Sequence, residues 1–424
     1  MRILFKNAKI LKMTDESIVE GCVVVNNNLI EKVGKNININ DKYNQVIDCQ
    51  GNLLMPGFKN AHTHSAMTFL RSVADDSSLQ DWLFKEIFPR EDNLHEGCIR
   101  ELAKVAILEY LTSGITCCFD MYFYPEEFRE TCEEIGFRAI NIDMYSKDNN
   151  PRESMLKLYN SNKKDGLVKY AIGMHAEYTS SEESLNETKK VLEETKSPFY
   201  THLGETLKET NDCINNRGMT PLQFFDSLGF FDYGGAIYHG VYLSDEDISL
   251  LKEKNISVVS CPCSNMKLAS GVAEIRKLLS RGVNVALGTD GPASNNALDM
   301  FREMYLVTGL QKIISKNPIS IPAFEVLKMA TVNGAIAMNL ENAKYLDEGQ
   351  LADIIMIDLS RPSMQPINNI INNIVYSGSK DCVKMTMING KILYYNGEFL
   401  IDEKIEDIYK KVQKLTEELK IIKA

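Results

Sequence analysis

The feature of the sequence that most limits its fold is a regular alternation of short apolar runs and helix-length segments between residues 58 and 288. Eight apolar runs are predicted strands, at Phe58–His62, Ile115–Asp120, Ala139–Met144, Tyr170–His175, Phe199–His202, Ala236–His239, Ser257–Ser260 and Val283–Gly288. Alternating strands and helices indicate a parallel sheet. Eight repeats over this length predict a closed (β/α)8 TIM-like barrel rather than an open sheet.

The segments between and after these strands carry helix-start and helix-stop signals, such as Ser244 before Asp245 and Gly114, Gly136 or Gly282 at the ends. The predicted helices are Cys98–Thr112, Glu126–Gly136, Glu153–Asn160, Ser181–Thr195, Pro221–Leu228, Asp245–Asn255, Gly271–Arg281, Ala297–Ile314 and Pro322–Met338.

Both ends of the chain have a different pattern, with short strands separated by turn residues. Strands are predicted at Ile3–Phe5, Ile18–Val25, Leu29–Val33 and Val46–Asp48, and again at Asp353–Leu359, Ile374–Ser377, Val383–Ile388 and Lys391–Tyr395. We expect the two ends, residues 1–56 and 346–424, to pair into one small β-sandwich domain beside a catalytic barrel domain at 57–345. The tail Asp402–Lys423 is predicted to form a terminal helix.

The composition argues against several classes of function. A net charge of −11 and a pI near 5.3 disfavour nucleic acid and anionic membrane as partners. The sequence has no apolar run of membrane-spanning length and no apolar core typical of a signal peptide at its start. Its 10 cysteines include no C-x-x-C pair, which favours reduced thiols in a cytoplasmic protein.

Five of the six histidines lie at the ends of predicted strands. His62 and His64 end the first strand, and residues i and i+2 of an extended chain point to the same side. The other strand ends carry His175, His202, His239 and Asp290. Because the carboxyl ends of barrel strands meet at one rim, these side chains should converge there. Imidazoles with one carboxylate predict a site for a divalent metal such as Zn²⁺.

A zinc site of this kind supplies hydroxide at neutral pH, because the pKa of zinc-bound water falls to about 7. Hydrolysis then needs a proton donor for the group that is protonated or expelled. Glu205 follows His202 by three residues, and residues i and i+3 of one strand face opposite ways. Glu205 is therefore expected in a loop above the metal.

These residues carry a family resemblance. The motifs M-P-G-x-x-N-x-H-x-H from Met55, H-x-x-E from His202 and T-D-G from Thr289 resemble the amidohydrolase superfamily. Four longer stretches, Asp81–Glu91, Gly173–Thr179, Cys263–Gly271 and Ala286–Asn296, are similar to the 5-methylthioadenosine/S-adenosylhomocysteine deaminases within it. The resemblance covers nearly the whole chain, and the N-M-K-L and G-T-D-G-x-A-S-N-N stretches are its most specific parts.

The resemblance implies a reaction, a metal and a set of roles. One zinc ion per subunit would be bound by His62, His64, His202 and Asp290. Asp290 would also take a proton from the zinc-bound water, and His239 would hold that water and the tetrahedral intermediate. Glu205 would protonate adenine N1 and relay protons to the departing ammonia.

The resemblance also implies a nucleoside pocket. His175 would contact the purine nucleoside, Glu91 would accept hydrogen bonds from the ribose hydroxyls, Trp82 would line the lid, and Ser294 would face the base. S-adenosylhomocysteine carries a carboxylate, which the family can bind with two arginines after the third strand. Only Arg152 matches, and Lys147 is the other cation nearby. This departure favours 5′-methylthioadenosine, 5′-deoxyadenosine or adenosine as substrate.

Other readings stay open at this point. Guanine deamination, cytosine deamination and triazine hydrolysis share the metal ligands, although the predicted ribose contact favours a nucleoside. A binuclear site with a carboxylated lysine is disfavoured because His175 stands at the fourth strand. A non-catalytic scaffold would be expected to lose ligands, and here each is present. A homo-oligomer is compatible with the site, but nothing in the sequence requires it.

Overall fold

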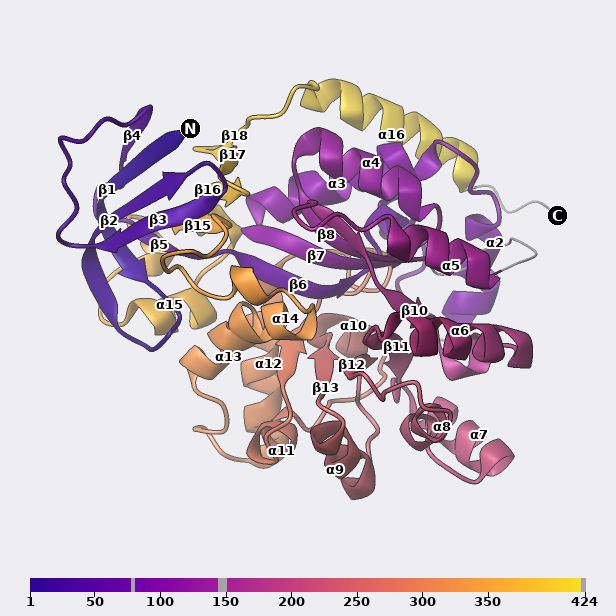
Figure 1. The fold of residues 1–424 in the computed structure, drawn as a ribbon. Coiled ribbons are helices and arrows are strands. Elements are labelled where there is room, and N and C mark those ends of the chain that lie inside the picture. Colours follow the sequence, from indigo (N-terminus) through magenta and orange to yellow (C-terminus); the bar gives the residue numbers. More distant parts are fainter. Residues whose placement is uncertain (78–80, 144–150, 421–424) are drawn as a thin grey trace.

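Strands far apart in the sequence form three sheets in the computed structural model, which describes residues 1–77, 81–143 and 151–420 (Figure 1). Two sheets are parallel throughout. One contains β6 (Phe58–Thr63), β7 (Ile115–Tyr122), β8 (Arg138–Asp143) and β9 (Val168–Tyr170), and the other contains β10 (Ile172–Met174), β11 (Phe199–Leu203), β12 (Gly235–His239), β13 (Ile256–Ser260) and β14 (Val285–Leu287). Helices lie around these strands (Figure 1).

The two parallel sheets meet at both of their edges. Between β9 and β10 stands only Ala171, whose N–H donates to the carbonyl of Asn141 on β8 at 2.9 Å. Beyond β14, the N–H of Asp290 donates to the carbonyl of His62 on β6 at 3.0 Å. Gly288 makes this approach possible, because a Cβ there would lie 2.8 Å from the His62 carbonyl oxygen.

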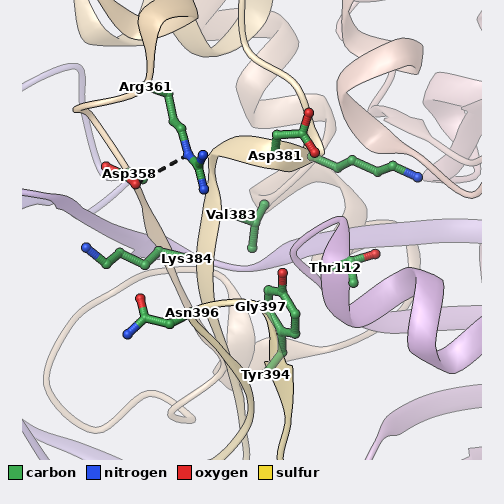
Figure 2. Close-up of a pocket in the computed structure, with 10 residues that line it drawn as sticks. Thr112, Asp358, Arg361, Asp381, Val383, Lys384, Tyr394, Asn396 and Gly397 are labelled. Atoms are coloured by element: carbon green, nitrogen blue, oxygen red, sulfur yellow. Dashed lines mark ion pairs between the residues drawn. The ribbon is translucent and has the colours of Figure 1, made fainter. Parts of the chain in front are cut away.

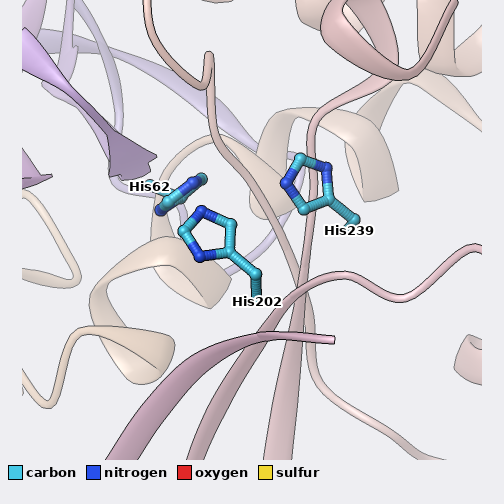
Figure 3. A group of neighbouring side chains, drawn as sticks. All are labelled: His62, His202 and His239. Atoms are coloured by element: carbon cyan, nitrogen blue, oxygen red, sulfur yellow. The ribbon is translucent and has the colours of Figure 1, made fainter. Parts of the chain in front are cut away.

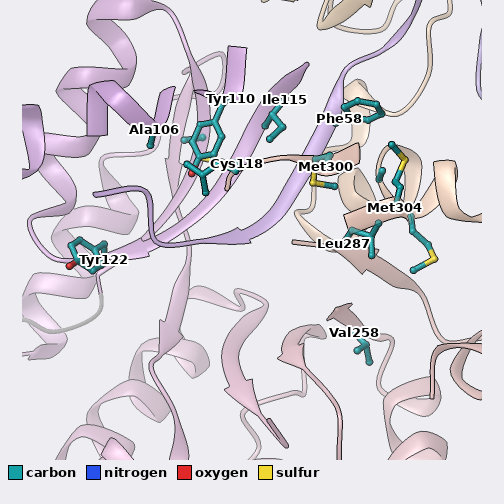
Figure 4. Close-up of a cluster of buried hydrophobic side chains, with 14 of the residues drawn as sticks. Phe58, Ala106, Tyr110, Ile115, Cys118, Tyr122, Val258, Leu287, Met300 and Met304 are labelled. Atoms are coloured by element: carbon teal, nitrogen blue, oxygen red, sulfur yellow. The ribbon is translucent and has the colours of Figure 1, made fainter. Parts of the chain in front are cut away.

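The main hydrophobic core lies between the parallel strands and the helices outside them (Figure 4). The helices that follow the strands are α3 (Cys98–Thr112), α4 (Pro125–Ile135), α5 (Pro151–Asn160), α6 (Glu182–Thr195), α7 (Leu207–Arg217), α8 (Pro221–Ser227), α9 (Asp245–Glu253), α10 (Pro262–Lys267), α11 (Ile275–Ser280), α12 (Met300–Ser315), α13 (Ala323–Met329) and α14 (Val332–Ala337). On α3, Leu102, Ala106 and Tyr110 recur at helical spacing and are buried. Each buried large apolar side chain of this core stabilises the fold by roughly 1.5–3 kcal/mol.

The third sheet joins the two ends of the chain. Its strands are β1 (Arg2–Leu11), β2 (Ile18–Asn26), β3 (Leu29–Gly34), β4 (Gln45–Asp48) and β5 (Leu53–Pro56) from the N-terminal end, and β15 (Ile354–Ile357), β16 (Val383–Ile388), β17 (Lys391–Tyr395) and β18 (Glu398–Phe399) from the C-terminal end. The two groups join where β5 pairs antiparallel with β15, with Leu53 opposite Ile357. Helix α15 (Ile370–Tyr376) lies between β15 and β16 in the sequence, and α16 (Ile405–Leu419) packs against α3 (Figure 1).

A buried polar cluster lies where the amino ends of the parallel strands meet this third sheet. The Lys59 ammonium donates to the carbonyl of Gly57 at 3.0 Å and to Thr116 Oγ1 at 2.8 Å. The Arg138 guanidinium, at the start of β8, donates to both carboxylate oxygens of Asp353 at 2.6 and 3.2 Å. Two charge-assisted bonds in this fork geometry connect the parallel strands to the third sheet.

Most predicted elements are confirmed with small changes at their ends, and α3, β16 and β17 have the predicted bounds. One prediction is wrong: Ile374–Ser377 is not a strand, because these residues end α15. The Asn369 side chain caps that helix by accepting from the Asn372 N–H at 2.9 Å. Its buried residues, including Ile370 and Ile374, repeat at helical spacing.

Other predicted elements are shorter or divided. The predicted strand Tyr170–His175 is interrupted at Ala171, and the predicted helix Pro322–Met338 is two helices, α13 and α14. The predicted helix Gly271–Arg281 begins only at Ile275. Helices α7 and α10 were not predicted. Met144, Lys147 and Lys423 lie outside the described residues. No helix in the described ranges combines the length and apolarity that crossing a bilayer requires.

Candidate metal centre and active site

The site begins with the two histidines at the end of β6. His62 is in the strand and His64 directly follows it, before a short 3-10 helix at Ser65–Leu70. Both side chains face the same carboxylate oxygen: the distance from Asp290 Oδ1 is 3.5 Å to His62 Nε2 and 3.2 Å to His64 Nε2. The prediction that both imidazoles enter one space is confirmed.

Two further strand-end histidines complete the cluster (Figure 3). One ligand atom each from His62, His202 and His239 lie within 4.8 Å of one another, and the same holds for His62, His64 and Asp290. All of these side chains are buried. The two groups share His62, so four histidines and one aspartate lie together at one site.

The donors fit a divalent metal ion. Both ring nitrogens of His62 are buried without a hydrogen-bond partner among the described residues. The Nδ1 atoms of His64 and His202 lie 2.5 and 2.7 Å from the backbone carbonyls of Met121 and His175, which leaves each Nε2 facing the cluster. Carbonyl contacts of this kind orient metal-binding imidazoles. Burial lowers the pKa of His62 to about 3, so it stays in the neutral form that binds metals.

Asp290 is held by hydroxyl and amide donors. Ser264 and Ser294 both donate to Oδ2, at 2.6 and 2.8 Å, and the Gly291 N–H donates to Oδ1 at 2.8 Å. Burial raises the pKa of Asp290, but the neighbouring imidazoles of His62 and His64 outweigh it and bring the pKa well below its ordinary value. Asp290 has φ of +57°, a conformation uncommon outside glycine and frequent at functional sites.

His239 and Glu205 face each other beside the cluster. His239 Nδ1 contacts Asn265 Oδ1 at 2.8 Å, and its Nε2 lies 3.8 Å from Glu205 Oε2. Glu205 follows the end of β11 in a loop, as predicted, and is buried. Burial raises the pKa of Glu205 to about 7, so the carboxyl group can hold and give a proton near neutral pH. Burial lowers the pKa of His239, but the negative charges of Glu205 and Asp290 outweigh it and raise the pKa.

The predicted lid residues lie on one short helical segment, a π-helix at Trp82–Ile87 followed by α2 (Phe88–Glu91). Glu91 is buried and accepts a hydrogen bond from Tyr122 at 2.5 Å through Oε1, while Oε2 has no partner in the described part of the chain. Burial raises the pKa of Glu91 to about 7, although the Tyr122 hydrogen bond lowers it. The buried Trp82 Nε1 also lacks an acceptor within the described ranges.

The remaining predicted residues are divided between the cluster and the outer helices. His175 follows β10, its ring centroid lies 4.7 Å from that of His202, and burial lowers its pKa to about 3. Arg152, in contrast, lies on α5 with 44% of its side chain exposed and pairs with Glu194 of α6 at 2.7 Å. Its described contacts do not bring it to the histidine cluster.

Three positioning contacts escaped the sequence predictions. Ser264 and Asn265 of α10 hold Asp290 and His239, and Tyr122 holds Glu91. The Lys267 ammonium, also on α10, donates to the Ala293 carbonyl at 2.9 Å and so connects α10 to the loop after Asp290. The C-S-N-M-K-L stretch that carries Ser264 and Asn265 comes directly after a strand end, and that position is the signal that could have identified them.

A surface cavity of about 540 Å³ lies elsewhere, on the third sheet (Figure 2). It is lined by residues of β16 and β17 and of the segment after β15, and Arg361 pairs there with Asp358 at 3.4 Å. No histidine of the cluster lines it. The chemistry therefore belongs to the strand ends and not to this cavity.

Comparison with known proteins agrees with this geometry. A model of the amidohydrolase family matches residues 53–393. The chain is 41% identical over 401 residues to the 5-methylthioadenosine/S-adenosylhomocysteine deaminase of Thermococcus sibiricus, covering 93% of this chain and 94% of the relative. It is 38% identical over 417 residues to the 5'-deoxyadenosine deaminase of Methanosphaera stadtmanae, covering 96% of each. A solved adenosine deaminase from Xanthomonas campestris with bound zinc matches with a TM-score of 0.93 at 29% identity, covering 98% of each chain. Because the family match covers most of its length, the chain belongs to the amidohydrolase family.

Proposed function

We propose that this protein is a zinc-dependent aminohydrolase that converts adenosine-type nucleosides and water into the inosine analogues and ammonia. The observation that carries the proposal is the buried pair of Glu205 and His239, 3.8 Å apart, beside the cluster of His62, His64 and Asp290. Aromatic C6 of adenine is a poor electrophile until a ring nitrogen is protonated. A carboxylic acid with a pKa of about 7 meets that need. Relatives named as deaminases of such nucleosides support the same substrate class.

The metal in this proposal is one zinc ion per subunit, held by His62, His64, His202 and Asp290. When bound, zinc lowers the pKa of water to about 7 and so supplies hydroxide at neutral pH. The two unpartnered nitrogens of buried His62 support this assignment, because a buried polar atom without a partner is costly. The zinc-bound adenosine deaminase from Xanthomonas campestris is consistent with it.

The residues of this chain divide the proton transfers. Asp290 accepts a proton from the attacking water through its carboxylate, which the two serine hydroxyls keep in place. Glu205 donates a proton to adenine N1, which the product keeps. Its carboxylate then takes the proton of the new C6 hydroxyl group and passes it to the C6 amino group, which leaves as ammonia as the C6–N bond breaks. The proton held by Asp290 finally returns to Glu205 and restores both groups. His239 Nε2 faces the oxygen that adds to C6, and its contact with Asn265 sets the orientation of the ring. The water oxygen replaces the amino nitrogen, so atoms and charge balance.

The substrate is held by the surrounding side chains. Glu91 accepts hydrogen bonds from the ribose hydroxyls through its free Oε2, Trp82 lines the same lid, and His175 contacts the nucleoside. Ser294 lies beside the base, although its hydroxyl hydrogen is directed to Asp290. Unpartnered buried acceptors are what a site built for hydroxyl groups requires.

The 5′ substituent is proposed to lack a carboxylate. Arg152 is paired with Glu194 at 2.7 Å, so a substrate carboxylate has to displace that partner. This favours 5′-methylthioadenosine, 5′-deoxyadenosine or adenosine over S-adenosylhomocysteine. The loop that lacks a second arginine, residues 143–150, lies outside the described residues from 144 onward.

We also propose that the two parallel sheets form one closed (β/α)8 barrel at residues 57–345. The contacts at Ala171 and between Asp290 and His62 support closure. Residues 1–56 and 346–424 then form one β-sandwich domain, which the pairing of β5 with β15 supports. A cytoplasmic location is consistent with 10 free cysteines, each buried.

Ammonia release by the zinc-loaded protein tests the proposal. The panel is 5′-methylthioadenosine, S-adenosylhomocysteine, 5′-deoxyadenosine, adenosine, adenine, guanine and cytosine. We expect activity on the adenosines only, with S-adenosylhomocysteine ranked last among them. Silence on every adenosine, with zinc verified by elemental analysis, refutes the proposed reaction and leaves only the family assignment.

A further inference from the structure

The loop that carries Glu205 is bound by a second carboxylate. Glu209, in the first turn of α7, accepts hydrogen bonds from three consecutive backbone N–H groups. Its Oε1 accepts from Gly204 at 2.9 Å, and its Oε2 accepts from Glu205 at 2.9 Å and from Thr206 at 3.3 Å. Three charge-assisted bonds thus hold the backbone on both sides of the Glu205 side chain.

This arrangement goes beyond ordinary helix capping. In a capping box, the third residue of the helix bonds only the N–H of the cap residue. Helices α6, α8 and α9 follow that rule, with Ser184, Gln223 and Asp247 each bonding a single backbone N–H, that of Ser181, Thr220 or Ser244. In α7 the bond to the cap residue, Thr206, is the longest of the three, and the two shorter bonds go to Gly204 and Glu205. Glu209 therefore holds the backbone of the loop at residues 204–206 and does not only cap the start of α7.

The other side of the loop is fixed as well. The Gly204 carbonyl accepts from the N–H groups of Val241 and Tyr242, both at 2.9 Å. Gly204 has φ of +62°, and a Cβ there would lie 2.9 Å from the Tyr242 carbonyl oxygen, so only glycine suits the turn. The Glu205 carboxyl group has its own nearest described partner, His239 Nε2, only at 3.8 Å, which is too long for a hydrogen bond. With no closer described ionic partner, the position of this carboxyl group depends on the backbone that carries it.

We propose that Glu209 is a positioning residue for Glu205: its carboxylate holds the 204–206 backbone so that the Glu205 carboxyl group faces the reacting purine ring. This inference rests on the proposed function, because it assumes that Glu205 carries the proton. Glu209 itself touches neither substrate nor metal ligand in this role.

Displacing a proton donor by about 1 Å costs on the order of 10²-fold in rate. We therefore expect Glu209→Ala to lower kcat about 100-fold, with KM and zinc content close to wild type, because the pocket and the ligands remain. Glu209→Gln keeps one acceptor oxygen, so its kcat should lie between those of wild type and Glu209→Ala. Gln223→Ala is the matched control, since it removes the equivalent capping contact of α8, and it should leave kcat unchanged.

A double-mutant cycle separates positioning from general destabilisation. If Glu209 acts through Glu205, adding Glu209→Ala to a Glu205→Gln background should cost no further activity. Hydrogen–deuterium exchange gives a readout independent of turnover. Amides of residues 204–206 should exchange faster in Glu209→Ala than in wild type or Gln223→Ala. The thermal midpoint should also fall further in Glu209→Ala, which loses three backbone hydrogen bonds, than in Gln223→Ala, which loses one.

Three results would overturn the inference: wild-type kcat in Glu209→Ala, fully additive losses in the double variant, or unchanged exchange at 204–206. These outcomes are distinct from failure of the proposed function. If wild-type protein with verified zinc deaminates none of the adenosines, the proposed function falls and the role assigned to Glu209 falls with it. If wild type is active and the Glu209 variants behave like Gln223→Ala, only the present inference is lost.

Discussion

Two clusters of buried charged side chains lie at opposite ends of the same parallel strands, and they differ in how completely their polar atoms are hydrogen-bonded. At the amino ends, Lys59 has two acceptors and Arg138 shares two bonds with Asp353. At the carboxyl ends, both ring nitrogens of His62 and Oε2 of Glu91 have no partner among the described residues. Buried polar atoms are normally satisfied, so the unsatisfied end is the one built to receive something.

Asp353 at the amino end and the two glutamates at the carboxyl end, Glu205 and Glu91, have pKa values perturbed in opposite directions. Burial raises the pKa of Asp353, but the charge and hydrogen bond of Arg138 outweigh it and bring the pKa below its ordinary value. Burial raises the pKa of Glu205 and of Glu91 to about 7, and no described arginine or lysine pairs with either. The amino end therefore keeps Asp353 ionised near neutral pH, while burial at the carboxyl end makes two carboxyl groups, Glu205 and Glu91, easier to protonate.

The largest expected effect is on turnover at the carboxyl end. Glu205→Gln keeps the shape and the metal ligands but removes the acid, so we expect kcat to fall about 10³-fold, within the range typical for a general acid. Zinc content and thermal midpoint should stay at the wild-type values. Ammonia release measures kcat, and elemental analysis measures the zinc content. A wild-type rate in this variant would refute the acid role of Glu205.

The contrast between the two ends also explains what the sequence can reveal. His62, His202, His239 and Asp290 could be placed at one rim because each ends an apolar run and because parallel strands bring their ends together. Those arguments need only local sequence and the fold class. The same logic located Glu205 in a loop, since strand alternation forbids it from facing the cluster from within β11.

Contacts that depend on loop conformation or helix packing could not be predicted from the sequence. Arg152 pairs with Glu194 because α5 and α6 pack together, and no local pattern encodes that. The end of α15 was predicted as the strand Ile374–Ser377, because its short apolar run Ile374-Val375-Tyr376 suits either structure. Helix α7 was missed although Thr206 and Glu209 form a capping-box signature, because the helix buries few apolar side chains.

The second prediction concerns stability at the amino end. Arg138→Met leaves the Asp353 carboxylate buried without its main partner, so we expect the free energy of unfolding to fall by about 3 kcal/mol. Denaturant unfolding measures this loss. Turnover per folded molecule and zinc content should not change, because Arg138 lies at the opposite end of the strands.

The matched control removes both charges. Arg138→Met combined with Asp353→Leu leaves no unpaired buried ion, so most of the lost stability should return. If the double variant is as unstable as the single one, the guanidinium contributes through packing or through its further bond to Asn389 at 3.1 Å rather than through Asp353.

A third, smaller effect is the pH dependence of that loss. In wild type, the pKa of folded Asp353 lies below its unfolded value, so the pair's contribution is complete above about pH 4 and disappears as pH falls through the folded pKa. Without Arg138, burial should place the pKa of folded Asp353 above its unfolded value. Protonation of Asp353 at lower pH then removes the buried unpaired charge and reduces the destabilisation of the variant. The gap between wild type and Arg138→Met should narrow by about 1–2 kcal/mol from pH near 7 to pH near 4.5. A gap that stays constant across this range would mean that Asp353 is not the group responsible.

The smallest predicted effect tests whether the unsatisfied oxygen of Glu91 is an acceptor for ribose. Tyr122 donates to Oε1, while Oε2 has no partner among the described residues. Tyr122→Phe removes one hydrogen bond, and we expect KM for nucleosides to rise about 5-fold, equivalent to about 1 kcal/mol. Glu91→Ala should raise KM further in the same direction, and free adenine should be affected by neither change. If KM for free adenine rises equally in both variants, Glu91 supports the pocket as a whole. Its role would then be structural, like that of the Arg138–Asp353 pair at the amino end, and Oε2 would not be a ribose acceptor.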